Sequence, residues 1–70
     1  MSLFEGSKVD PQAPPGKIRF LVREHQKDYF IADHDLPMTP EEIASEARHH
    51  AGPGLEVYAY DEEGKLVCSA

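Results

Sequence analysis

The chain has 70 residues and a formal net charge of −6, with hydrophobic residues at 40% and charged residues at 29%. This length allows one small domain, and the composition is typical of a globular chain. The acidic balance argues against binding to a nucleic-acid backbone, which requires clustered lysine and arginine. Because the sequence has neither an apolar run of membrane-spanning length nor a basic-then-apolar leader, we expect a cytoplasmic protein that does not bind a membrane.

The first 16 residues differ in composition from the rest of the chain. They contain Gly6, Gly16 and three of the six prolines, and they hold few large apolar side chains. This composition predicts a flexible N-terminal segment over residues 1–16 and a single α+β domain over residues 17–70. An alternative is that Leu3 and Phe4 form an arm that docks on a partner subunit.

Two strands are expected next, joined as a hairpin. In residues 17–23, Ile18, Phe20 and Val22 alternate with Lys17, Arg19, Leu21 and Arg23. The polar residues 24–28 form the turn, and residues 29–33 form the second strand. Because residues 29–32 are apolar on both sides of the strand, the pattern predicts that this second strand is central in the sheet.

A helix over residues 40–51 has clear signals at both ends. Thr39 is a good N-cap, Pro40 suits the first helical position, and Glu42 completes a capping box. Gly52 is expected in the left-handed conformation after the last turn, and Pro53 prevents continuation. The predicted helix therefore has about three turns.

The apolar side of this helix carries mostly small side chains. Ile43 is its one large contact residue, and the others are Pro40, Ala44, Ala47 and Ala51. Glu46 falls on the polar side, with His50 at the boundary. The strands must therefore supply most of the core, and the helix covers one face of a sheet.

The last third of the chain predicts a second hairpin, with strands at residues 55–60 and 65–69 and a turn at residues 61–64. The sequence does not determine how the residues of these two strands pair. If Tyr60 pairs with Lys65, then Leu66 and Cys68 share the helix-facing side; a one-residue bulge in the turn places Val67 there instead. The order ββαββ predicts a four-stranded antiparallel sheet with one helix packed on one face.

Few residues indicate chemistry. Cys68 is the only cysteine, so an internal disulfide is excluded, and Gly52-Pro53-Gly54 follows the helix rather than preceding it, which disfavours a phosphate site. The sequence shows no set of residues typical of a catalytic site. It therefore predicts a non-enzymatic protein without a cofactor, and it assigns no residue as a metal ligand.

The run Asp33-His34-Asp35 is the most suggestive local cluster, and the sequence leaves open whether it binds a metal. Its composition is also typical of a turn. The histidines at positions 49 and 50 lie at the far end of the helix, about 15–18 Å away by the rise per residue, which is too far to share one ion.

The sheet face that the helix leaves open is the main candidate for function. It is expected to carry one of Tyr29 or Phe30 together with the interface candidates Arg19, Leu21, Arg23, Tyr58 and Tyr60. Aromatic and arginine side chains are enriched in interface cores, and a domain of about 70 residues has little core of its own. We therefore predict a protein-interaction module that forms a homodimer through this face.

The alternative is an acidic inhibitor or antitoxin-like protein that binds a basic partner protein. The run Tyr29-Phe30-Ile31-Ala32, followed by Leu36-Pro37 and Thr39 before a glutamate-rich helix, resembles the hairpin-then-helix half of small antitoxins of the HicB kind. The resemblance covers less than half of the chain and implies no residue roles.

Overall fold

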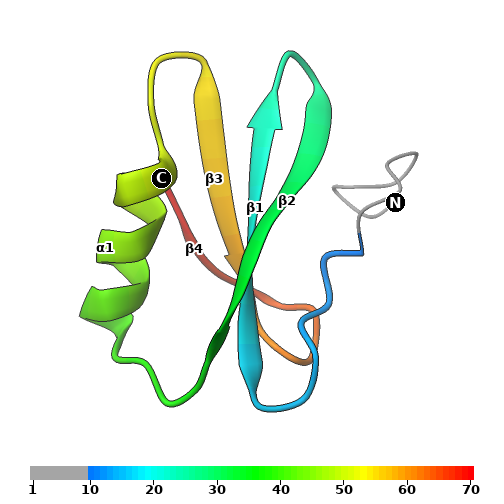
Figure 1. Cartoon of the computed structure of the whole chain (residues 1–70), viewed down its shortest axis with the longest axis vertical. Helices are drawn as coiled ribbons and strands as arrows, with labels where there is room; N and C mark the ends of the chain where they lie inside the picture. Colours follow the sequence, from blue (N-terminus) through cyan, green and yellow to red (C-terminus); the bar gives the residue numbers. More distant parts are fainter. Residues whose placement is uncertain (1–9) are drawn as a thin grey trace.

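The computed structural model describes residues 10–70 and confirms the predicted α+β fold, with elements in the order ββαββ. The elements are β1 (Lys17–Glu24), β2 (Lys27–Asp35), α1 (Pro40–His50), β3 (Leu55–Tyr60) and β4 (Leu66–Ser69). Neighbouring strands are antiparallel in one four-stranded sheet, and α1 packs on β3 and β4 (Figure 1).

The strand order is β2-β1-β3-β4, so β1 is central and β2 lies at an edge. The prediction that the second strand is central was therefore wrong. Both β2 and β3 pair with β1, and α1 connects them across the sheet. Apolar residues on both sides of a strand indicate burial only when other elements cover them, and the structure leaves Tyr29 46% and Phe30 49% exposed.

The β1–β2 hairpin closes through a two-residue turn. Glu24 pairs with Lys27, and the intervening His25 and Gln26 have φ values of 50° and 65°. Two consecutive positive φ values are typical of a type I′ turn, which matches the twist of the flanking strands. A register shift opposite Phe20 and Leu21 makes Ile31 the extra residue of a β-bulge in β2.

The start of α1 is as predicted. The Thr39 hydroxyl accepts from the Glu42 N–H at 3.1 Å, and the Glu42 carboxylate accepts from the Thr39 N–H at 2.9 Å. The capping box therefore satisfies two amides that the helix itself leaves unpaired. Pro40 occupies the first turn, where it sacrifices no helical hydrogen bond.

The end of α1 differs from the prediction. Ala51 is the C-cap in an extended conformation, and Gly52 does not have a positive φ. Pro53 explains the difference, because a proline disfavours the helical region for the residue before it. The chain turns instead over residues 52–55, with Gly54 at φ 77° and the Leu55 N–H donating to the Gly52 carbonyl at 2.9 Å.

The second hairpin adopts neither of the two registers considered. Its turn is as expected, with Gly64 at φ 79° and its N–H donating to the Asp61 carbonyl. However, Tyr60 pairs with Leu66 and Ala59 with Cys68, so Val67 is the extra residue of a bulge within β4. Cys68 consequently packs against the core, while Leu66 and Val67 are exposed.

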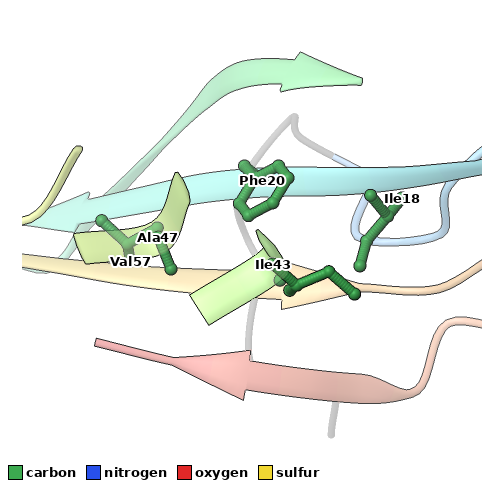
Figure 2. Packing of buried hydrophobic residues seen from close by; sticks show 6 residues of the cluster. Ile18, Phe20, Ile43, Ala47 and Val57 are labelled. Atoms are coloured by element: carbon green, nitrogen blue, oxygen red, sulfur yellow. The ribbon is translucent and has the colours of Figure 1, made fainter. Parts of the chain in front are cut away.

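The core lies between α1 and one face of the sheet. Figure 2 shows Ile18 and Phe20 from β1 and Val57 from β3 around Ile43 and Ala47 of the helix. All five are buried, and Ile43 is the only large side chain that the helix contributes. This confirms the prediction that the strands supply most of the large side chains of the core and that the helix packs over them.

Residues 10–16 contact the end of the sheet near the β3–β4 turn. Ala13 is buried, and its N–H donates to the Asp61 carbonyl at 3.1 Å. The Glu62 carboxylate accepts from the Gly16 N–H at 2.7 Å, and its carbonyl accepts from the Gln12 side chain. The predicted flexibility of residues 1–9 and the alternative arm at Leu3 and Phe4 lie outside the described residues.

Candidate interaction surface

The second face of the sheet, opposite α1, centres on Leu21. Strand alternation turns Ile18, Phe20 and Val22 of β1 toward the helix, so Arg19, Leu21 and Arg23 point to the other side. The pairings place Phe30 and Tyr58 on either side of Leu21, and Tyr60 beside Arg19. The five interface candidates therefore do share one face. Phe30, not Tyr29, is the aromatic that joins them.

Arg19 is held in place by three kinds of contact. Its Nε and Nη2 atoms donate to the two carboxylate oxygens of Asp33 at 2.8 and 3.0 Å, and Nη1 donates to the Asp10 carbonyl at 2.8 Å. The guanidinium carbon lies 5.1 Å from the centre of the Phe30 ring. The hydrogen bond to Asp33 raises the pKa of Arg19, so its charge is permanent.

Arg23 repeats this arrangement on the other side of Leu21. It donates to Asp28 at 2.8 and 3.4 Å, and its guanidinium lies 5.9 Å from the centre of the Tyr58 ring. The Tyr58 hydroxyl donates to the Glu56 carboxylate at 2.6 Å. This hydrogen bond, followed by burial, raises the pKa of Tyr58.

Burial divides the five candidates. Leu21 is completely buried and Tyr60 is 6% exposed, whereas Arg19, Arg23 and Tyr58 are partly exposed. Burial also raises the pKa of Tyr60. Leu21 is thus the buried centre of this face, and partly exposed side chains surround it. We call these residues the arginine–aromatic face: Arg19, Leu21, Arg23, Phe30 and Tyr58.

Asp33, His34 and Asp35 do not form a cluster. Asp33 pairs with Arg19, and Asp35 pairs with Lys17, both on the second face. The Lys17 hydrogen bond lowers the pKa of Asp35. His34 points to the helix side, where its ring makes an edge contact with Phe20 at 5.2 Å between centroids. Strand alternation thus separates the three residues that the sequence places side by side.

The structure shows one polar group that sequence reasoning missed. The Glu46 carboxylate lies 2.9 Å from His50 Nε2 and 3.6 Å from His34 Nε2. The expectation that His50 lies about 15–18 Å from the run at residues 33–35 was therefore wrong for His34, because both imidazoles approach the same Glu46 oxygen. The four-residue spacing of Glu46 and His50 was a visible signal, but the approach of His34 was not, because it depends on how α1 crosses the sheet. Among residues 10–70, no group of three or more His, Cys, Asp or Glu side chains is arranged to hold a metal ion.

The accessible groups of the arginine–aromatic face are fixed arginines, aromatic rings and paired carboxylates. In the described part of the chain, no helix is long and apolar enough to cross a membrane. Comparison with known proteins adds no functional assignment. No protein-family model matches the sequence, and no curated protein or solved structure shows a significant match to it.

Proposed function

We propose that this chain is a small non-enzymatic interaction module that self-associates through the arginine–aromatic face of its sheet. The observation that best supports the proposal is the exposure of Phe30 beside a fixed arginine. Its ring is 49% exposed, yet it lies under a guanidinium that Asp33 fixes through two hydrogen bonds. An exposed aromatic group whose neighbours are already ordered loses little conformational entropy on binding.

The second arginine–aromatic pair supports the same reading. Arg23 is fixed by Asp28 and lies over Tyr58, so Leu21 has a rigid stacked pair on each side. Arginine and aromatic side chains dominate the binding energy of many interfaces, especially where the apolar base is already dry. Exposed aromatic rings beside fixed arginines on a sheet face suit another protein surface, whereas a small molecule needs a concave site.

The experiment is sedimentation equilibrium on the full chain up to about 100 µM, a range that detects dissociation constants in the micromolar region. We expect a dimer, and Phe30→Ser is expected to weaken it about tenfold or more, as loss of a central aromatic contact does. Leu66→Ser is the matched control, because Leu66 is 52% exposed on the other edge strand. A monomeric wild-type chain at this concentration would overturn the proposal.

A second candidate function, an acidic inhibitor or antitoxin-like protein for a basic partner, has one observation in its favour. A groove of about 400 Å³ runs along the first half of α1. Met38 forms its apolar part, and Glu41, Glu42 and Glu46 supply three carboxylates. An apolar base with carboxylates around it suits a lysine or arginine side chain of a partner.

This candidate is tested by calorimetric titration with a lysine-rich peptide at low and high salt. The alternative predicts heat at about 20 mM salt that disappears near 300 mM, as expected for exposed ion pairs. Glu41→Gln combined with Glu42→Gln is expected to abolish the signal. Glu63→Gln removes an exposed carboxylate from the β3–β4 turn and is the control, because it leaves the Glu62 contact with Gly16 intact. No binding at low salt would exclude the alternative for peptides of this type.

A further inference from the structure

Strand β2 has the composition of a central strand but the position of an edge strand. Tyr29 is 46% and Phe30 is 49% exposed, and the following Ile31 and Ala32 are only partly buried. Within residues 10–70, β2 pairs with β1 alone. Natural edge strands are usually short or carry charges along their length, because an open apolar edge invites pairing with another strand. This edge is nine residues long, and its middle carries no charge.

The charge distribution favours approach along this edge. The β1–β2 hairpin holds equal numbers of cations and carboxylates: Lys17, Arg19, Arg23 and Lys27 against Glu24, Asp28, Asp33 and Asp35. Its net charge is zero, so the protein's charge of −6 arises elsewhere in the chain. Two copies that meet hairpin to hairpin therefore bring their neutral regions together and keep their acidic regions apart.

The two ends of β2 also complement each other. Lys27 is exposed at the start of the strand, and Asp35 is exposed at its end. An antiparallel arrangement of two β2 strands about a two-fold axis places the basic start of each copy beside the acidic end of the other. The bulge at Ile31 then lies near the axis, and residues 28–30 of one copy run along residues 33–35 of the other, so that residues opposite each other lie on the same face of the joined sheet.

We propose that β2 pairs antiparallel with β2 of a second copy, so that the two four-stranded sheets join into one continuous sheet. The inference rests on the proposed self-association and names the strand that mediates it. Phe30 lies at the seam on the second face, and Tyr29 lies at the seam on the helix side. The edge supplies backbone hydrogen bonds, and the two aromatic side chains supply apolar contact on each side of the joined sheet.

A groove beside the edge provides room for the second copy. It has a volume of about 400 Å³ and is lined by Val22, Glu24, Tyr29, Ile31, His50 and Leu55. It exists because α1 lies over β3 and β4 (Figure 1). The helix helps to bury Ile18 and Phe20 of β1, but it leaves Val22 and the helix side of β2 only partly covered. Edge pairing places the helix side of the partner's β2 next to this groove, where its apolar side chains contact Tyr29 and Ile31.

The first test compares two lysine substitutions on opposite edges. Tyr29→Lys places a charge on β2, and Val67→Lys places one on β4 at a position that is also 46% exposed. We expect Tyr29→Lys to weaken the dimer about tenfold or more and Val67→Lys to change it less than about twofold. Circular dichroism and thermal melting establish that each variant is folded. The reverse order of effects would place the contact at β4 and overturn the inference.

The second test measures the direction of pairing. Spin labels are attached through Lys27→Cys or Asp35→Cys in a Cys68→Ser background, and the two labelled proteins are mixed. Antiparallel pairing predicts a short distance between positions 27 and 35 of different copies and about 25 Å between the two copies of position 27, given the rise per residue of a strand. A short distance between identical positions would indicate parallel strands and contradict the inference.

These outcomes separate this inference from the proposed function. A dimer that Phe30→Ser weakens and Tyr29→Lys leaves intact associates through the arginine–aromatic face without edge pairing, which overturns the inference alone. A chain that is monomeric without any substitution overturns both. Loss of the dimer in both variants, together with a short distance between positions 27 and 35, supports self-association by edge pairing. It also limits the contact of the arginine–aromatic face to Phe30, because a continuous sheet leaves Arg23 and Tyr58 uncovered.

Discussion

Asp28 and Asp35 are both β2 carboxylates paired with a cation of β1, but their side chains are 6% and 84% exposed, respectively. Asp28→Asn removes the carboxylate that accepts hydrogen bonds from Arg23 at a site where the Asp28 side chain is almost fully buried, and we expect it to lower the free energy of unfolding by about 1–2 kcal/mol. Asp35→Asn is expected to leave the urea midpoint unchanged, since its pair is solvent-screened. Equal midpoints for the two variants in urea denaturation would show that the Arg23–Asp28 pair adds no stability.

The tyrosines of β3 predict a loss of stability in alkali. The pKa of Tyr58 is raised by its hydrogen bond to Glu56, and that of Tyr60 is raised by burial. A raised folded-state pKa contributes stability that is fully present below the unfolded value of about 10 and is lost as the pH rises through the folded value. The thermal midpoint is therefore expected to fall above about pH 10, and less steeply in Tyr58→Phe. Identical pH profiles for the two proteins would remove Tyr58 as a cause.

At the scale of a single element, the β1–β2 turn holds the clearest local conflict between sequence and backbone. His25 and Gln26 occupy positive φ values that Asn and Gly adopt more readily. We expect His25→Asn combined with Gln26→Gly to raise the free energy of unfolding by about 1–2 kcal/mol, since backbone strain in the folded state is relieved. Gly54→Ala is the converse control: its φ is 77°, so it should destabilise the protein although no atom blocks the new methyl group. Urea denaturation measures both changes.

The elements that the sequence predicts well are those whose causes are local. The capping box at Thr39 and Glu42 and the Asp61–Gly64 turn depend on residues a few positions apart, and both are present. The same holds for the two sides of β1, because alternation along one strand assigns them. The arginine–aromatic face could therefore be anticipated, with Phe30 or Tyr29 as its remaining ambiguity.

The features that the sequence does not predict depend on contacts between distant residues. The place of β2 at the edge follows from how α1 and β3 return to the sheet, and nothing in residues 29–32 encodes it. The bulges at Ile31 and Val67 shift the register by one residue, which local alternation cannot indicate. The wrong prediction for β2 is informative. Its residues have the apolar composition of a buried strand, but the structure places them at an exposed edge, and such a mismatch between sequence and environment is expected at binding sites.

At the scale of the whole molecule, charge is unevenly distributed. Residues 36–70 hold seven of the thirteen acidic residues but only two of the seven cations, whereas the β1–β2 hairpin is neutral. This asymmetry gives the protein one side on which electrostatic repulsion between copies is weak. It also makes the response to salt different for self-association and for capture of a basic partner.

Two charges of −6 about 25 Å apart in water repel by about 6 kcal/mol before screening, and a Debye length of about 10 Å at 0.1 M salt removes most of this energy. We therefore expect the dimer to tighten about tenfold or more when salt rises from about 20 to 300 mM, as measured by sedimentation equilibrium. Binding of a basic partner has the opposite sign, because salt screens attraction in that case. A dimer that weakens steadily with salt would contradict this expectation. It would mean that ion pairs across the contact, such as Lys27 with Asp35, outweigh the net repulsion. The apolar edge of β2 would then not be the main source of affinity.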